Sequence, residues 1–527
     1  MSAPAATTLA PQPAEEVSLR TWVAIFAGLL GAFMAVLDIQ ITNASLKEIL
    51  GSLSATPEEG SWISSAYLVA EIIAIPLAGF MAIVFSLRRY LMVNVVLFLL
   101  SSTMCGAAWN LESMIVFRAL QGFTGGVLIP LGLFMITRYL PLSKRPIGLA
   151  LFGITATLAP TLGPTVGGWL TTLYSWPTIF YINWAPGLVL LGGIAWGLDR
   201  QPMQLGLLRT ADWFGIAVMA IGLGSLTAML EEGNAKSWFE SDFIRVTGFF
   251  SLAGITLWIW RSLTVKNPFV DLRIFARPSF LIASVTAFTA GLGLYGSAFI
   301  LPLFLGQIAG YTPLEIGQVI MWMGLPQIFV MPLAARLSTR IDNRILMTFG
   351  LILFSGSCFM NASMSVETAG PQLIAAQVVR ALGQPFLMIT LTNFATQGVP
   401  VAQLPSASGM FNMMRNLGGS VGIASLATLL TLREQFHSAR VGESISLYEP
   451  TTLARLDALI QNFMLRGADS AAAQEMAVRS LDNLVRKQSF VMAYNDAFLV
   501  LGASLLGCIV VVWMGERVIG GGKPGGH

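Results

Sequence analysis

The stretch WVAIFAGLLGAFMAVLDIQITNA, residues 22 to 44, is apolar almost throughout and carries a single charged residue, Asp38. A bilayer core about 30 Å thick is crossed by roughly 20 residues of helix. The stretch is therefore long enough and apolar enough to cross a membrane. Since it lacks a small-residue cleavage site before the next loop and is too long for a signal-peptide core, we expect it to remain as the first membrane helix.

The rest of the chain has the same character. Its 527 residues are 55% hydrophobic and only 11% charged, with a mean hydropathy of +0.72, whereas soluble domains carry about 25% charged residues. The composition predicts an all-α integral membrane protein that crosses the bilayer many times. We predict fourteen membrane helices, at residues 22–44, 62–83, 90–109, 112–134, 147–171, 177–198, 211–230, 243–260, 279–303, 315–335, 345–364, 371–396, 408–430 and 491–514.

The loops between these segments differ in charge in a way that predicts their orientation. Lys and Arg are enriched in the cytoplasmic loops of membrane proteins, and here the cations gather in alternate loops. We therefore expect those loops and both chain ends to be cytoplasmic, including a leader at 1–20 and a Gly-rich tail at 516–527. The cation-rich loops hold Arg88 and Arg89; Arg138, Lys144 and Arg145; Arg200 and Arg209; Arg261, Lys266, Arg273 and Arg277; and Arg336, Arg340 and Arg344. The other loops hold few cations, mainly Lys47, Lys236 and Arg245, among acids such as Glu58, Glu59, Glu231, Glu232, Glu240 and Asp242.

Two stretches indicate an internal duplication. VFRALQGFTGG (116–126) and VVRALGQPFLM (378–388) each place Arg-Ala-Leu and a nearby glycine in an apolar helix. Many secondary transporters are built from such repeats and bind substrate where the repeats meet. We expect a six-helix half at 21–200, two extra helices at 201–265 and a second six-helix half at 266–515.

A hydrophilic stretch of mixed charge separates the last two predicted membrane helices, at residues 431–490. Its apolar residues recur at helical spacing, and the predicted orientation places it on the outer face. A loop this long often has a function of its own. It is either a spacer between helices or a contact for a partner protein.

Two acids lie deep inside predicted membrane helices. A charge at the bilayer centre costs at least about 2.5–3.5 kcal/mol, so a functional role is the first hypothesis for such a residue. Because desolvation favours the protonated form of a carboxyl group, Asp38 is a candidate proton carrier. Glu71, in YLVAEIIAIPLAGF (67–80), is a second candidate. Alternatively, Asp38 is a fixed ion-pair partner or a hydrogen-bonding group in helix packing, and Glu71 is a carboxyl group that faces a wet cavity without an essential role. Asp496, near the outer end of its segment, is a weaker candidate.

Three arginines also fall in predicted membrane helices. Arg118 and Arg380 occupy corresponding positions in the two similar stretches, and Arg415 lies in NMMRNLGGSVG (412–422). An opposite charge within a few Å favours an ionised carboxylate, so separating the pair would drive proton uptake. We expect Arg118 to tune Asp38 or Glu71; static bracing of a helix end is the alternative. Weaker candidates for the substrate cavity or for coupling are Asn43, Gln121, Arg380 and Arg415.

Other motifs limit the chemistry. APTLGPTVGG (159–168) combines Pro160 and Pro164 with Gly163, Gly167 and Gly168, which permits a bend and close helix packing. Three cysteines lie far apart in sequence inside predicted membrane helices, so we expect no disulfide and no metal site; they are Cys105, Cys358 and Cys508. The sequence contains no G-x-x-x-x-G-K-[ST] or H-E-x-x-H motif, so we expect neither nucleotide hydrolysis nor zinc chemistry.

Taken in order, the motifs resemble those of the major facilitator superfamily, in particular its fourteen-helix drug:proton antiporters of the EmrB/QacA type. LDIQITNASLKEI (37–49) is similar to the helix 1 signature of that family, and FRALQGFTGG to its helix 4 motif. APTLGPTVGG resembles the helix 5 antiporter motif, and SWPTIFYINWAPG (175–187) a stretch typical of this branch. One departure is GFMAIVFSLRRY (79–90), where Ile83 and Val84 replace the Asp and Arg of the family's helix 2–3 loop.

The resemblance implies a major facilitator fold with two six-helix halves plus two extra helices. It implies proton-driven export of hydrophobic or amphipathic drugs across the bacterial inner membrane, with Asp38 exchanging protons and Arg118 modulating it. It also implies a tripartite machine with an EmrA-type periplasmic adaptor and an outer-membrane channel, and no enzymatic activity or cofactor. The alternatives are a dedicated exporter of one natural product, such as a fatty acid or siderophore, and a non-transporting membrane sensor or scaffold.

Overall fold

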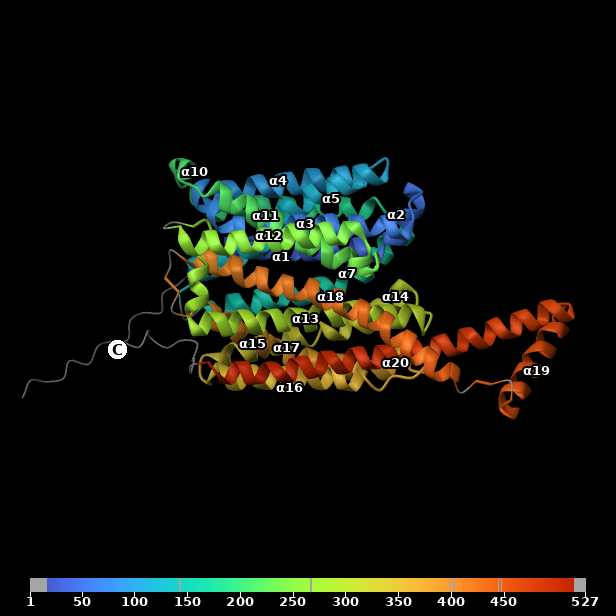
Figure 1. Ribbon diagram of the computed structural model, residues 1–527. Coiled ribbons are helices and arrows are strands. Elements are labelled where there is room, and N and C mark those ends of the chain that lie inside the picture. The colour runs from blue at the N-terminus through green and yellow to red at the C-terminus, as the bar shows by residue number, and fades with distance from the viewer. Residues whose placement is uncertain are drawn as a thin grey trace, which may run out of the picture.

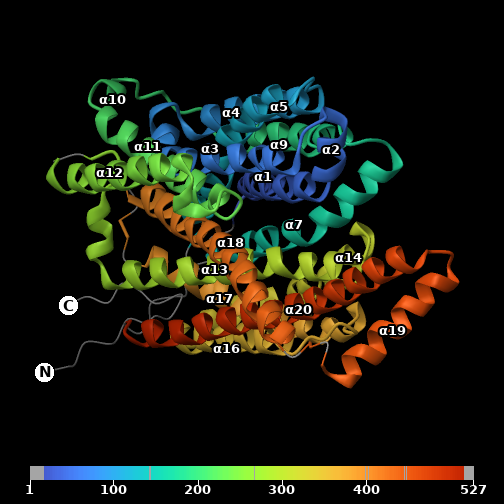
Figure 2. The same ribbon diagram turned by 45° about the vertical axis from the view of Figure 1, so that its right-hand side comes forward.

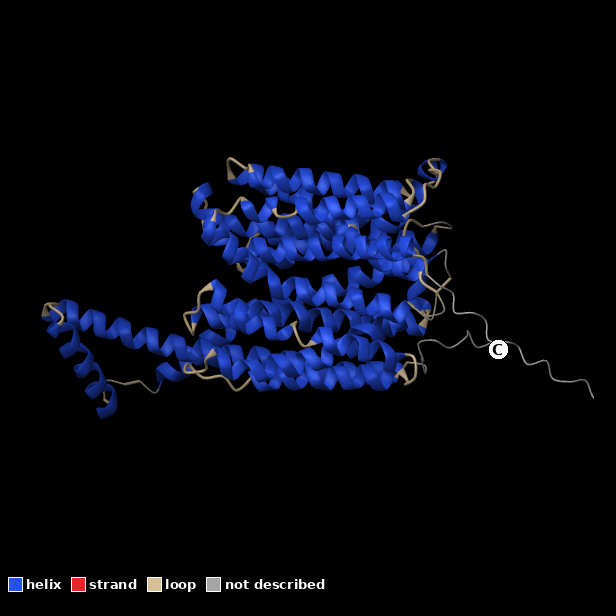
Figure 3. Ribbon diagram, turned by 180° about the vertical axis from the view of Figure 1, so that it is seen from behind, coloured by secondary structure: helices blue, strands red, loops and turns tan. Residues whose placement is uncertain are grey.

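The computed structural model describes residues 17–141, 144–265, 268–397, 399–400, 403–443, 445–446 and 448–515, and in these residues it contains helices but no strand (Figure 3). Most of the predicted leader and all of the Gly-rich tail lie outside the described residues. The helices are α1 (Leu19–Ala44), α2 (Leu46–Leu53), α3 (Pro57–Val84), α4 (Leu87–Gly106), α5 (Leu111–Gly126), α6 (Leu128–Tyr139), α7 (Arg145–Leu173), α8 (Thr178–Tyr181), α9 (Trp184–Gly197), α10 (Gly206–Arg209), α11 (Trp213–Gly233), η1 (Trp238–Glu240), α12 (Asp242–Thr264), η2 (Leu272–Ala276), α13 (Pro278–Gln307), α14 (Pro313–Ile320), η3 (Met321–Met323), α15 (Gln327–Ser338), α16 (Asn343–Asn361), α17 (Gly370–Thr396), α18 (Leu404–Glu443), α19 (Pro450–Leu465) and α20 (Ser470–Trp513).

Each predicted membrane segment coincides with one helix or with consecutive short ones, as in α5–α6, α8–α9 and α14–α15. Within the described residues, twelve helices are long and apolar enough to cross a membrane, and the bent helix α7 would make thirteen. The long helix α18 is not among them. The all-helical, many-span character is therefore confirmed, whereas the count of fourteen stays a prediction.

The helices pack side by side in two groups (Figure 1). The first group is built from α1 to α9, where α1 packs on α7 and α9, and α3 packs on α5. The second is built from α13 to α20, where α13 packs on α18, and α16 packs on α17. The groups meet where α3 contacts α18 and where α7 contacts α14 and α15. The additional pair α11 and α12 pack on each other, with α11 against α3.

Helix α11 corrects one detail of the predicted loops. The sequence places Glu231 and Glu232 in an outer loop, but the helix continues to Gly233. Glu232 is fully buried there, and its carboxylate accepts hydrogen bonds from Ser61 (3.0 Å) and Ser65 (2.9 Å) of α3. Serine hydroxyls from a neighbouring helix satisfy this acid, so it need not face water.

Helix α7 carries the bend that its prolines predict. Its segments Ile147–Pro160 and Leu162–Leu173 meet at 43°, because a proline inside a helix removes one backbone hydrogen bond and crowds the preceding turn. The glycines beyond the bend let α7 approach α1 closely. A Cβ atom at Gly163 would overlap that of Gln40, and one at Gly167 would lie 2.9 Å from the carbonyl oxygen of Ile41.

The predicted outer stretch 431–490 is largely helical and extends the flanking membrane helices. Helix α18 runs on to Glu443, and α20 begins at Ser470. The 44 residues of α20 span about 66 Å at 1.5 Å per residue, roughly twice the hydrocarbon thickness. Figures 1 and 2 show α19 and the start of α20 projecting from the end of the bundle where α2 and α14 lie. At the base of this projection Asp496 contacts Arg433 (2.6 Å) and His437 (2.7 Å) of α18.

Candidate functional site

The buried carboxylate of Asp38 lies in the middle of the first group of helices. Asp38 is 2% exposed on α1, and Arg118 of α5 is fully buried beside it. A guanidinium Nη1 of Arg118 donates to Oδ2 of Asp38 at 2.6 Å. Of the two acids that the sequence offers, Asp38 is therefore the one in direct contact with Arg118.

Two neutral amides complete the hydrogen bonds of Asp38. Gln121, one turn after Arg118, donates to Oδ1 of Asp38 at 2.9 Å and accepts from Arg118 at 2.8 Å. Asn183, at the junction of α8 and α9, donates to the same Oδ1 at 2.7 Å and to the hydroxyl of Ser102 at 3.0 Å. The carboxylate therefore accepts three hydrogen bonds from buried donors.

The guanidinium of Arg118 is held from several sides. Its Nε donates to the carbonyl oxygen of Ile63 at 3.2 Å. The ring of Tyr67 lies 4.4 Å from its central carbon and the ring of Phe180 at 5.9 Å, within the range of cation–π attraction. Its Nη2 atom has no hydrogen-bond partner. Arg118 is therefore fixed in place by α3 and α8, so the pair separates only if α1 or α5 moves.

Glu71, the second predicted acid, lies where the two groups of helices meet. Glu71 is 3% exposed on α3, and its Oε1 accepts a hydrogen bond from Asn416 of α18 at 3.4 Å. Arg415 and Arg118 lie close enough for their charges to act on it. Glu71 thus joins the two groups of helices, whereas Asp38 is bound entirely within the first. Asp496 lies in neither place, since it is paired at the base of the outer projection.

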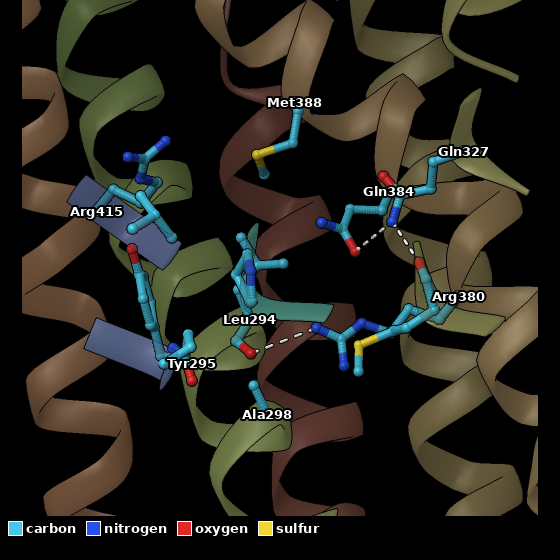
Figure 4. Close-up of a pocket in the computed structure, with 12 residues that line it drawn as sticks. Leu294, Tyr295, Ala298, Gln327, Arg380, Gln384, Met388 and Arg415 are labelled. Carbon is cyan, nitrogen blue, oxygen red and sulfur yellow. Dashed lines mark hydrogen bonds between the residues drawn. The ribbon is translucent and has the colours of Figure 1, made fainter. Parts of the chain in front are cut away.

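A central cavity lies between the two groups (Figure 4). The centre of a water molecule can move through about 40 Å³ of it, which is room for about three waters. Pockets that hold drug-sized ligands are about 300–1,000 Å³, so in this conformation the cavity is smaller than such a pocket. The cavity is lined by Val36, Gln40, Pro160, Leu294, Tyr295, Ala298, Met323, Gln327, Arg380, Gln384, Met388 and Arg415.

Helix α1 separates this cavity from the Asp38–Arg118 pair. Val36 and Gln40 line the cavity and stand two residues before and after Asp38. Residues two apart on a helix are rotated by about 200°, so their side chains point in nearly opposite directions. The carboxylate and the cavity therefore occupy opposite sides of one helix, and a movement of α1 changes both.

The other predicted candidates are spread over several places. Gln121 belongs to the Asp38 cluster, and Arg380 and Arg415 line the cavity. Pro160 lines the cavity as well, while Gly163 and Gly167 make the contact between α7 and α1. Asn43 lies outside both the Asp38 cluster and the cavity. It is exposed and accepts a hydrogen bond from Ser64 at 2.6 Å. Pro164 and Gly168 are half-buried on α7.

Asn183 is the main residue that the reasoning from sequence missed. It lies in SWPTIFYINWAPG, where the sequence indicates only a resemblance to the family. An asparagine between two apolar segments is itself a signal, because an amide inside a membrane needs a partner. Among the described residues, no group of three His, Cys, Asp or Glu side chains could hold a metal ion, and the three cysteines are free and buried.

Comparison with known proteins gives consistent matches. A family model described as "Major Facilitator Superfamily" matches residues 28–423. The chain is 33% identical to "Colistin resistance protein EmrB" of Acinetobacter baumannii, over 92% of this chain and 94% of that protein. It is 30% identical to "Multidrug export protein EmrB" of Escherichia coli K12 (94% and 96% covered) and to "Fatty acid resistance protein FarB" of Neisseria gonorrhoeae (96% and 98%).

Solved structures share the fold at low sequence identity. The human organic anion transporter MFSD10 is 13% identical, with a TM-score of 0.58 over 92% of this chain and 99% of that one. A bacterial homolog of the lysosomal transporter Spinster, also 13% identical, has a TM-score of 0.53 over 95% and 97%. With the family match, these likenesses confirm the fold that the sequence motifs imply.

Proposed function

The chain belongs to the Major Facilitator Superfamily, and on this premise we propose that it is a proton-driven exporter of hydrophobic or amphipathic compounds. The single observation that carries this proposal is the buried pair of Asp38 and Arg118, whose atoms lie 2.6 Å apart. A scaffold or sensor has no need for an ion pair inside the membrane, because burying two charges costs several kcal/mol for each ion. A transporter uses such a pair as the part that binds and releases protons.

The geometry suggests how proton exchange is coupled to the cavity. While Asp38 is ionised, Arg118, Gln121 and Asn183 hold α1 against its neighbours. Protonation removes the charge that Arg118 attracts, so α1 is released on that side. The opposite side of α1 carries Val36 and Gln40, which line the cavity, so release of α1 alters the space that is open to a substrate.

The close packing of α1 on α7 supports this coupling. Without side chains at Gly163 and Gly167, the two helices are in backbone contact and can slide past each other. Glu71 is the weaker second candidate for proton binding, since it contacts Asn416 across the boundary between the two groups. A change in its charge would act on that boundary directly.

The same proposal covers location and assembly. We place the protein in the bacterial inner membrane with both chain ends in the cytoplasm, because the cationic loops carry residues such as Arg200 and Arg209. Helix α10 lies at the end of the bundle opposite the α19–α20 projection (Figure 1), so that projection is periplasmic. It is then the natural contact for an EmrA-type adaptor that leads to an outer-membrane channel.

A second candidate function is the export of one natural product such as a fatty acid or siderophore. The Neisseria relative, whose name refers to fatty acid resistance, favours it. A strain that lacks this protein would then lose resistance to one chemical class only. Multidrug export predicts a loss of resistance to several unrelated compounds.

The experiment that tests the proposal is gradient-driven transport of a fluorescent amphipathic dye into inverted vesicles, whose lumen corresponds to the periplasm. Unmodified protein is compared with Asp38→Asn at matched expression, and Asp199→Asn serves as control because Asp199 is an exposed acid. We expect Asp38→Asn alone to lose dye export and dissipation of the gradient. Equal export by Asp38→Asn would make Asp38 structural and Glu71 the leading proton carrier.

A further inference from the structure

The central cavity contains two buried arginines on opposite walls. Arg380 comes from α17 and Arg415 from α18, and each is 4% exposed. Figure 4 shows their guanidinium groups on either side of the space, with Leu294 of α13 between them. The Nε atom of each lacks a hydrogen-bond partner in the structure.

Neither arginine has a carboxylate among the described cavity-lining residues, which include no Asp or Glu. Arg415 has Glu71 nearby, outside the lining, and the two charges act on each other. Arg380 has no such neighbour in the part of the chain that the structure describes. Its Nη2 donates to the carbonyl oxygen of Leu294 at 3.3 Å, and its guanidinium lies 4.7 Å from the ring of Phe354. Burying an unpaired charge is costly, so a counter-charge that enters the cavity would be bound favourably.

The rest of the lining suits the remainder of such a molecule. Leu294, Ala298, Met323 and Met388 form an apolar wall, and methionine side chains adapt to ligands of different shape. Gln327 and Gln384 hydrogen-bond to each other at 3.2 Å, and Oε1 of Gln327 has no partner. The cavity thus offers two cations, neutral amides and an apolar surface.

We propose that this cavity, when the two groups of helices open around it, binds amphipathic anions. Arg380 holds the carboxylate, the charge of Arg415 attracts it from the opposite wall, and the apolar body lies against the methionines. The inference rests on the proposed function only in taking the central cavity as the substrate site. Arginine matches a carboxylate because its planar fork can donate two parallel hydrogen bonds. Arg380 is the main anchor, since Glu71 offsets part of the charge of Arg415. A cation of the same shape is repelled by both arginines and finds no lining carboxylate.

The test measures binding, which needs no proton gradient. The full-length protein is placed in nanodiscs of neutral phosphatidylcholine, and three fluorescent probes with one apolar body are titrated: 11-(dansylamino)undecanoate, its methyl ester and the corresponding trimethylammonium compound. We expect the carboxylate probe to bind at least about tenfold more tightly than the other two, in line with a charge-assisted hydrogen bond.

Substitutions assign this preference to residues. We expect Arg380→Gln to weaken carboxylate binding by about tenfold or more and to leave methyl ester binding unchanged, which also shows that the variant is folded. Arg415→Gln should have a smaller effect. Arg433→Gln removes an equal charge from α18 outside the cavity and should bind all three probes as the unmodified protein does.

Three results would overturn the proposal. The first is equal affinity for the carboxylate and trimethylammonium probes, and the second is unchanged carboxylate binding in Arg380→Gln. The third is displacement of the probe by phosphatidylglycerol, which would assign the arginines to a lipid headgroup. Dye export by the unmodified protein separates this proposal from the proposed function, because binding in nanodiscs needs no proton gradient. If the unmodified protein binds the anion without any export, the transport proposal fails and the binding site stands.

Discussion

Removing one charge of the Asp38–Arg118 pair should destabilise the protein far more than removing both. At an effective dielectric constant of about 20, two unit charges 2.6 Å apart attract by about 6 kcal/mol. Desolvation of both groups offsets much of this attraction, so the intact pair adds little net stability. A single substitution, however, leaves the other charge buried without a partner, which costs about 3–5 kcal/mol.

This reasoning gives a quantitative double-mutant cycle. Asp38→Asn and Arg118→Gln should each lower the free energy of unfolding by about 3–5 kcal/mol. The double variant keeps amides at both positions and leaves no buried charge, so its loss should be smaller than either single loss, which corresponds to a coupling energy of at least about 3 kcal/mol. The assay is equilibrium unfolding of the purified proteins in mixed micelles with increasing sodium dodecyl sulfate.

Two results would refute the reasoning. Additive losses in the cycle would show that the two side chains do not interact as a buried pair. Dye export by the recovered double variant, at a rate near that of the unmodified protein, would show that Asp38 is not needed for proton exchange. We expect the double variant to be stable but unable to export dye. This result would separate the contribution of the pair to stability from its role in proton coupling.

Further predictions concern the contacts around this pair and the outer projection. Gly163→Val should push α7 away from Gln40 of α1. We expect it to lower stability by about 1–3 kcal/mol and to slow dye export. Gly192→Val is the control, since an added Cβ there meets nothing within 4 Å, and it should change neither stability nor export. Asn183→Leu should remove a hydrogen bond to a charged group, worth about 1.5–3 kcal/mol, and reduce export; unchanged stability and export would contradict its place beside Asp38. Replacing residues 445–484 by a short Gly/Ser linker should leave dye transport into inverted vesicles intact and abolish co-purification with the adaptor, and retained co-purification would place the adaptor contact elsewhere.

The sequence alone was sufficient to predict the class of protein and the positions of its membrane helices. Hydropathy is a property that each segment carries by itself, so α1 and α3 could be located without knowing their neighbours. The same is true of the bend in α7, which its own prolines cause. Asp38 and Arg118 were recognisable for a related reason: a charge in an apolar segment is conspicuous whatever surrounds it.

Tertiary structure decided which of these groups meet. The sequence offered two acids as partners for Arg118, and the rotation and packing of α1 against α5 selected Asp38 and placed Glu71 at the contact with α18. The packing of α17 left Arg380 facing the cavity without an acid, although its motif resembles that of Arg118. Asn183 joined the cluster through the junction of α8 and α9. Such pairings depend on the relative rotation of helices that are distant in sequence, and no single segment contains that information.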